Sequence, residues 1–324
     1  MTPNLPFLFV ISLLTCCIEI DISVPSFPDI SDYFDISDGL TQMTIAVNFF
    51  GFCLSSVVYG PLSDSYGRRN VMLIGNAIML IGAVLCVVAH SIELLLIARF
   101  IQGFGASTSA VVVFAMIADV YESEKAAKLI GVMNSLITVF MSIAPIAGGF
   151  INNLVGFRGN YFVIALVSLI SWVMLYFQLP ETKKEKKPLE IRTIAKNFYI
   201  LATDKRFLYA SLTPSLTYSG YMSFIACAPF LYIETYNLPI MYYAINQGII
   251  IAIFSMFSMY SGRITSHLGE KTCVIFGTTL LFLGGAFGLL VGLLFPKSPF
   301  LTTSFMTIYS IGAAITYPII FTKS

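Results

Sequence analysis

Three charged side chains lie inside long apolar stretches in the first third of the chain: Glu19, Asp21 and Arg99. An ionised group in a bilayer is costly unless it faces a water-filled cavity or an opposite charge. Glu19 and Asp21 point about 200° apart on a helix, so only one can readily face a central cavity. Arg99 keeps its charge and could pair with Asp21. Alternatively, the acids lie in water at the interface and Arg99 reaches the lipid headgroups.

A charged turn separates two apolar stretches and contains Gly60, Pro61, Asp64, Gly67, Arg68 and Arg69. Gly60 and Pro61 are expected to end the first stretch, and Gly67 supplies a turn position that a side chain would obstruct. Asp64 and the two arginines place both charge signs close enough to pair. Asp119, at the end of a later apolar stretch, is the expected partner of one arginine. Alternatively, these charges only set the topology in the membrane.

The composition is that of a membrane protein. Of 324 residues, 57% are hydrophobic and 11% are charged, whereas about a quarter of residues in soluble domains are charged. The net charge of +1 argues against a nucleic-acid partner. The six cysteines fit neither a zinc site nor a disulfide framework, so we expect no metal. The sequence has no Walker A, nucleophile-elbow or H-E-x-x-H pattern, so we expect neither an enzyme nor a cofactor.

Ten apolar stretches have about the 20 residues that a helix needs to cross a bilayer. They predict an all-α polytopic membrane protein with spans at residues 5–25, 40–62, 71–89, 94–118, 129–154, 161–179, 207–233, 240–260, 273–295 and 300–321.

The basic residues predict the orientation of these spans. If the turn at 60–69 is cytoplasmic, fifteen Lys and Arg residues lie on that side and only Arg158 and Lys297 on the other. Such an excess marks the cytoplasmic side. The N-terminus is then cytoplasmic, and the acidic loop at 26–39 faces outward.

A polar segment at 180–206 divides the chain. We expect an N-terminal six-helix bundle (1–180), a cytoplasmic linker (181–206) and an incomplete C-terminal bundle of four helices (207–324). The basic run at 183–187 is expected at the anionic inner leaflet, with a regulatory site as the alternative. A short interfacial helix is expected at 191–201.

Residues 262–271 repeat the charged turn, with Ser266 in the place of Asp64 and Lys271 in the place of Arg69. The offset is 269 − 67 = 202 positions, which predicts parallel repeats of the kind found in secondary transporters. By this offset, we expect the equivalents of the last two helices of the first bundle to be missing. Either a partner supplies them, the sequence is partial, or the gene has been truncated.

Together these motifs resemble the major facilitator superfamily. The turn at 60–69 is similar to its G-x-L-x-D-x-x-G-R-R/K loop, and residues 99–105 are similar to its R-x-x-Q-G-x-G motif. The fifth span resembles the antiporter motif of drug exporters at four positions, Gly131, Pro145, Gly148 and Gly149. Phe140 and Ala144 replace two glycines of that motif. The Ala144-Pro145 pair, the Asp21…Pro25 ending and residues 118–121 resemble the bicyclomycin/chloramphenicol-resistance (Bcr/CflA) branch.

The resemblance implies a proton-coupled exporter of small amphipathic compounds or drugs, working by alternating access in a bacterial inner membrane. It favours Asp21 as the proton- or substrate-linked acid, with Glu19 as the second candidate and Gln102 as a polar contact beside Arg99. The charged turn and Asp119 would form a latch that stabilises the outward-facing state. The fifth-span motif would seal the protein against leak, or would be only a structural kink.

A drug-sized apolar substrate needs a large, mostly hydrophobic cavity. The candidate cavity aromatics are Tyr218, Tyr221 and Phe224, for which packing against lipid or within the bundle is the alternative. We expect a monomer in the lipid bilayer that binds a small-molecule substrate and protons. Two other functions stay open: a major facilitator carrier for a nutrient or metabolite, and a truncated remnant that does not transport.

Overall fold

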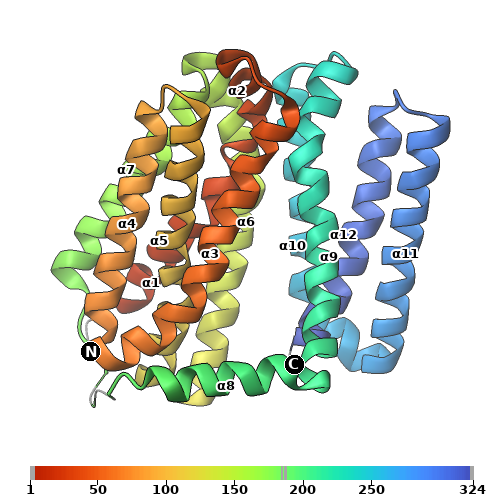
Figure 1. The fold of residues 1–324 in the computed structure, drawn as a ribbon. Coiled ribbons are helices and arrows are strands. Elements are labelled where there is room, and N and C mark those ends of the chain that lie inside the picture. Colours follow the sequence, from red (N-terminus) through yellow and green to blue (C-terminus); the bar gives the residue numbers. More distant parts are fainter. Residues whose placement is uncertain (1–3, 184, 186–187, 322–324) are drawn as a thin grey trace. The chain divides into compact units, whose positions relative to one another are not determined.

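The structure is a computed structural model that describes residues 4–183, 185 and 188–321, and in these residues it contains helices and no strands (Figure 1). The chain divides into two compact units, Met1–Glu190 and Ile191–Ser324. Within the described residues, nine helical segments are long and apolar enough to cross a membrane. The predicted all-α polytopic fold is therefore confirmed, and the tenth predicted span, at 300–321, is not among these nine segments.

The first unit contains α1 (Leu5–Asp21), the 3-10 turn η1 (Val24–Ser26), α2 (Phe27–Phe34), α3 (Asp38–Tyr66), α4 (Arg68–Val88), α5 (Ile92–Val120), α6 (Ser123–Val155) and α7 (Phe157–Gln178). Serines begin two of the long helices. The hydroxyl of Ser37 accepts a hydrogen bond from the backbone N–H of Leu40, and that of Ser91 accepts one from Leu94. Such caps satisfy amides that the first turn leaves unpaired.

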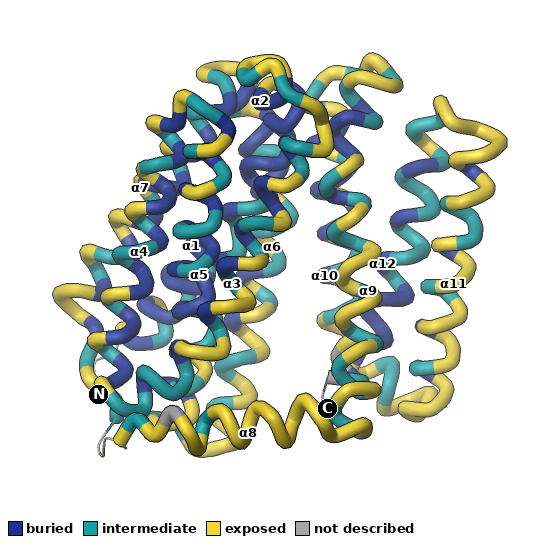
Figure 2. The backbone as a smooth tube through the Cα atoms, viewed as in Figure 1, coloured by how far each residue is buried: buried dark blue, intermediate teal, exposed yellow. Residues whose placement is uncertain are grey.

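The second unit contains α8 (Ile191–Thr203), α9 (Lys205–Pro229), the π-helix η2 (Phe230–Thr235), α10 (Ile240–Leu268), α11 (Glu270–Leu294) and α12 (Pro299–Phe321). α8 is the short helix expected in the polar segment. Figure 2 shows α8 exposed along almost its whole length, whereas the long helices of this unit have buried and exposed faces.

In the first unit, α5 packs closely against α3 and α4 because glycines remove side chains where the helices cross. A Cβ atom on Gly103 would collide with the carbonyl oxygen of Asn48 in α3, and one on Gly105 would collide with the backbone of Met79 in α4. Small residues allow this approach in membrane helices. The polar residues of α5 are thereby brought within hydrogen-bonding distance of α3.

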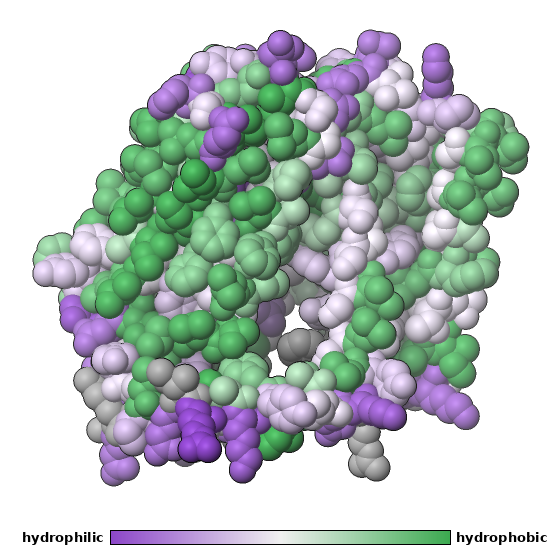
Figure 3. All heavy atoms as spheres, viewed as in Figure 1, coloured by the Kyte–Doolittle hydropathy of each residue, from purple (hydrophilic) through white to green (hydrophobic). Residues whose placement is uncertain are grey.

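Hydrophobic residues cover most of the height of the visible face of the first unit, and hydrophilic residues gather at its two ends (Figure 3). Many large apolar side chains of the spans are exposed, including Phe50, Ile74 and Phe150. A bilayer solvates such a surface, so an apolar exterior costs nothing there.

Two local predictions were wrong. Gly60 and Pro61 do not end a helix, because α3 continues through Pro61 to Tyr66 and the chain turns at Gly67, whose φ is 100°. Membrane helices tolerate proline when neighbouring groups satisfy the freed backbone. The acidic loop at 26–39 is also largely helical: α2 begins with Pro28 in its first turn, and Asp29 lies beside the positive end of its dipole.

Candidate functional site

A buried ion pair joins α1 to α5. The Nη1 atom of Arg99 lies 3.7 Å from Oε2 of Glu19, and both side chains are 1% exposed. Asn48 in α3 connects the two, because its Nδ2 atom donates to Oε1 of Glu19 at 3.3 Å and to the backbone carbonyl of Arg99 at 3.1 Å. Three helices therefore meet at one carboxylate and one guanidinium.

Gln102, one turn after Arg99 on α5, completes this cluster. Its Oε1 atom accepts a hydrogen bond from Nη1 of Arg99 at 2.7 Å and another from the thiol of Cys86 at 3.6 Å. The ring of Tyr161 in α7 lies 5.9 Å from the guanidinium carbon, within the range of a cation–π contact. We call Glu19, Asn48, Arg99, Gln102 and Tyr161 the Arg99 cluster.

The Arg99 cluster leaves part of its hydrogen-bonding capacity unused. Within the described part of the chain, Nε and Nη2 of Arg99, Nε2 of Gln102 and Oε2 of Glu19 are buried and make no hydrogen bond. Buried polar atoms of this kind are costly and are expected to find partners when the structure rearranges. Oε2 of Glu19 can therefore accept a proton or a hydrogen bond, and the three nitrogens can donate to a polar ligand group or to new protein partners.

Asp21 does not meet Arg99. Its side chain is buried at 4% exposure, and it makes no hydrogen bond or ion pair with any residue that the structure describes. The helix repeat explains why Glu19 is the partner instead. Ser12 and Glu19 are seven positions apart, so they share a face of α1, and Ser12 already contacts Ser109 of α5 at 2.7 Å. The sequence spacing groups Glu19 with Ser12, but only the contact of Ser12 with Ser109 shows that this face of α1 meets α5.

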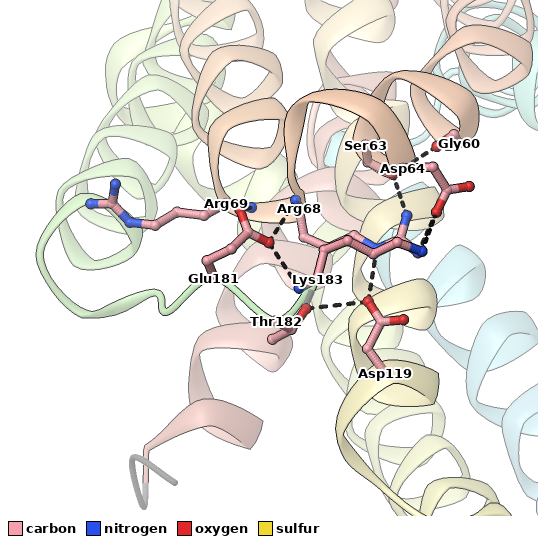
Figure 4. Close-up of polar contacts among 9 residues, drawn as sticks. All are labelled: Gly60, Ser63, Asp64, Arg68, Arg69, Asp119, Glu181, Thr182 and Lys183. Carbon is pink, nitrogen blue, oxygen red and sulfur yellow. Dashed lines mark hydrogen bonds and ion pairs between the residues drawn. The ribbon is translucent and has the colours of Figure 1, made fainter. Parts of the chain in front are cut away.

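A second polar cluster surrounds Arg68, at the start of α4 (Figure 4). The guanidinium contacts two carboxylates, with Nε 2.9 Å from Oδ2 of Asp119 and Nη2 2.9 Å from Oδ1 of Asp64. A third nitrogen donates to the hydroxyl of Ser63. Arg68 therefore ties the end of α3 to the end of α5, and the structure brings together Asp64, Arg68 and Asp119 of the predicted set.

The segment that follows α7 contacts the residues around Arg68. The carboxylate of Glu181 accepts hydrogen bonds from the backbone N–H groups of Arg68 at 2.9 Å and Arg69 at 3.3 Å, so it caps the N-terminus of α4. Lys183 places Nζ 2.7 Å from Oδ1 of Asp64, and Thr182 donates to Asp119 at 3.3 Å. Glu181 and Thr182 were missed by sequence reasoning because more than 60 positions separate them from their partners.

Arg69 and Gly60 take little part in this Arg68 cluster, which comprises Ser63, Asp64, Arg68, Asp119, Glu181, Thr182 and Lys183. The side chain of Arg69 points away from it (Figure 4). Arg69 donates instead to the backbone carbonyls of Leu179 at 2.8 Å and Tyr176 at 2.7 Å. Gly60 contributes only its carbonyl, which accepts from the hydroxyl of Ser63 at 2.8 Å.

The predicted antiporter motif of α6 separates into two parts. A Cβ atom on Gly148 would collide with the carbonyl oxygen of Ile22, at the end of α1. Pro145 and Gly149 are buried beside it. Gly131 lies far from this contact, and an added Cβ would meet nothing within 4 Å. Gly148 therefore sets how closely α6 approaches the end of α1 that carries Glu19 and Asp21.

The predicted aromatic residues of α9 have different environments. Tyr218 is 43% exposed. The hydroxyl of Tyr221 accepts a hydrogen bond from Gln247 of α10 at 3.2 Å. Phe224 makes an edge contact with Phe305 of α12, with ring centroids 6.0 Å apart, so it packs inside the second unit.

Two other predictions concern metals and the basic run. Among the described residues, no group of three or more His, Cys, Asp or Glu side chains could hold a metal ion. Of the basic run at 183–187, residues 184, 186 and 187 lie outside the described residues.

The sequence profile of the Major Facilitator Superfamily matches residues 9–323. The chain is 29% identical over 282 residues to a bicyclomycin resistance protein homolog of Haemophilus influenzae, covering 85% of this chain and 70% of that protein. It is 24% identical over 264 residues to the chloramphenicol resistance protein CraA of Acinetobacter baumannii, covering 82% of this chain and 64% of that protein. Among solved structures, the partially occluded inward-open xylose transporter XylE of E. coli superposes with a TM-score of 0.76 at 16% identity, covering 98% of this chain and 85% of that one.

Proposed function

This chain belongs to the major facilitator superfamily of transporters, and we propose that it exports small amphipathic compounds across the bacterial inner membrane in exchange for protons. The observation that carries the proposal is the buried Glu19–Arg99 pair. The names of the relatives, which concern bicyclomycin and chloramphenicol resistance, support drugs as the substrate class. Transport would proceed by alternating access, with the N-terminus in the cytoplasm.

Glu19 is the proposed proton-binding group, in place of Asp21. When Glu19 is ionised, its charge and that of Arg99 cancel. A proton on Glu19 would leave the positive charge of Arg99 buried without compensation, and separating such a pair costs about 3–5 kcal/mol. Proton uptake would therefore favour a conformation in which Arg99 finds water or another partner. A shift of a two-state equilibrium needs a difference of this kind between the states.

The remaining members of the Arg99 cluster would control this shift. Gln102 would keep its hydrogen bond to the guanidinium when Glu19 is protonated, because its Oε1 atom accepts from Nη1 of Arg99 at 2.7 Å. Asn48 would couple this shift to α3, because its amide nitrogen donates hydrogen bonds both to Glu19 and to the backbone carbonyl of Arg99. Asp21 is a second buried acid, and we propose that it binds a polar or cationic group of the substrate.

We further propose that the Arg68 cluster is a latch at the cytoplasmic end of the first unit. Its contacts join the ends of α3 and α5 to the segment after α7 through two carboxylates and one arginine. Salt bridges at helix and subunit interfaces are exchanged in known switching transitions. The latch would stabilise one state and open when the two bundles rock.

Transport into everted membrane vesicles tests the proposal. Chloramphenicol should accumulate when the vesicles carry an inward-acid proton gradient, and a protonophore should abolish the accumulation. Glu19→Gln should lose gradient-driven uptake while still exchanging labelled for unlabelled compound. The matched control is Glu93→Gln, because Glu93 is an exposed acid in the first turn of α5.

Two results would contradict the proposal. Uptake that persists after the gradient collapses would indicate a facilitator-type carrier. If Asp21→Asn removed the coupling and Glu19→Gln kept it, Asp21 would be the coupling acid and the role given to the ion pair would be wrong. The amount of folded protein in each vesicle preparation is measured in parallel, so that loss of protein is not counted as loss of coupling.

A further inference from the structure

A largely apolar groove of 640 Å³ opens on the surface of the first unit, between α3, α4 and the end of α7. Its walls include Leu62, Ile74, Tyr66 and Tyr176, and the last three are 47–60% exposed. The groove lies at the end of the unit that carries the Arg68 cluster, because Arg69 and Asn70 of α4 also line it. One end of the groove is therefore polar and the remainder is hydrocarbon.

The polar end carries a positive charge that no carboxylate balances. The guanidinium of Arg69 donates to the carbonyls of Leu179 and Tyr176, and within the described residues no acid lies within salt-bridge distance of it. The nearby Glu181 binds backbone N–H groups instead. Figure 4 shows the Arg69 side chain directed away from the acids of the Arg68 cluster.

A largely apolar groove with one cation at its polar end matches the chemistry of a phospholipid. The acyl chain would lie along the groove, and the phosphate would lie at Arg69 and the amide of Asn70. Tyrosines with an apolar body and a polar tip are typical of the headgroup level, where Tyr66 and Tyr176 would then lie. We propose that this groove is a binding site for an anionic phospholipid of the adjacent leaflet, held by Arg69.

A helix of a second copy fits the groove less well. A helix about 10 Å wide fills roughly 400 Å³ per turn, so the groove holds fewer than two turns of one. Such a helix would also have to bring a carboxylate to Arg69 at a precise height, whereas a lipid places its phosphate there by its own position in the bilayer. The lipid proposal does not depend on which compound the protein transports.

The chain contains its own reporter for this site, because Trp172 is its single tryptophan. The indole N–H donates to the carbonyl of Leu73 at 3.0 Å, and the ring stacks on Tyr176 with centroids 5.3 Å apart. Both of these neighbours line the groove. Bromine atoms on an acyl chain in the groove should therefore quench the fluorescence of Trp172.

The experiment reconstitutes the full chain in vesicles of phosphatidylcholine that contain increasing fractions of brominated phosphatidylglycerol. The reverse mixture, brominated phosphatidylcholine in phosphatidylglycerol, is measured in the same way. One basic residue near the surface favours an anionic lipid by about fivefold, so phosphatidylglycerol should quench at about one fifth of the fraction that phosphatidylcholine requires. High salt should reduce this preference.

Variants assign the preference to Arg69. Arg69→Gln should make the two lipids quench equally, whereas Arg69→Lys should retain the preference because it keeps the charge. Arg192→Gln is the matched control, since Arg192 is an exposed basic residue of α8 and does not line the groove. Equal quenching by the two lipids in the unmodified chain would overturn the proposal, as would an unchanged preference in Arg69→Gln. Weak quenching by both lipids would also overturn it, because it would show that protein and not lipid covers the groove.

Discussion

Removal of one charge from the Glu19–Arg99 pair should destabilise the first unit strongly. At the separation of 3.7 Å, two unit charges attract each other by about 4.5 kcal/mol at an effective dielectric constant of about 20. Loss of one partner from a buried pair costs about 3–5 kcal/mol. Arg99 keeps its hydrogen bond to Gln102, so we expect Glu19→Gln to lose about 3 kcal/mol, at the lower end of this range.

A double-mutant cycle separates the charge effect from packing. Arg99→Met removes the charge but keeps most of the side-chain volume, and it should also destabilise because Glu19 is then left alone. The double variant should lose about 1–3 kcal/mol less free energy of unfolding than the sum of the two single losses, because it leaves no uncompensated charge. Glu93→Gln, on the exposed first turn of α5, should change stability by less than about 0.5 kcal/mol.

Unfolding by SDS in mixed micelles, followed by circular dichroism of the helices, measures these differences. Strict additivity of Glu19→Gln and Arg99→Met would refute the reasoning, because it would mean that the two side chains do not interact. A neutral Glu19→Gln variant would refute it as well, since it would show that Arg99 already has a sufficient set of partners in water or lipid.

Two further predictions concern contacts that hold helix ends in place. Glu181→Gln should weaken the cap of α4 by about 1.5 kcal/mol, so the first amides of that helix should exchange hydrogen for deuterium about tenfold faster. The control is Glu185→Gln, four positions along the same segment, which should leave these exchange rates unchanged. Equal rates in both variants would exclude the cap. Gly148→Ala should cost about 1–3 kcal/mol because its Cβ collides with the end of α1, whereas Gly131→Ala on the same helix should be neutral or stabilising. SDS unfolding compares these two, and a neutral Gly148→Ala would contradict the close contact.

Much of the fold followed from local patterns. Each of the ten apolar stretches contains a helix, because a run of about 20 apolar residues has few alternatives in a bilayer. Helix ends were predicted less well. α3 runs from Asp38 to Tyr66 and α6 from Ser123 to Val155, beyond the predicted spans at both ends. Hydropathy marks only the part of a helix that lies in lipid, whereas backbone hydrogen bonds continue into the charged ends.

The sequence indicated which residue types could form a candidate site, but it did not indicate which of them pair. The sequence indicated two acids in α1, an arginine in α5 and charges at the turn before α4, and the structure describes all of them. The sequence could not indicate that Asn48 joins Glu19 to Arg99, because an asparagine in a membrane helix can have many different partners. It also did not indicate that Gly131 stands apart from the contact made by Gly148.

The sequence by itself determined the membrane class, the approximate positions of the long helices and the family, since these depend on composition and on motifs whose residues lie within one turn or one helix. Only the tertiary structure decided which acid meets Arg99, because the rotation of α1 against α5 depends on packing along its whole length. It alone also showed Glu181 capping α4 across 113 positions of sequence. A contact of that separation is specified by how helices pack, and no local pattern of residues records it.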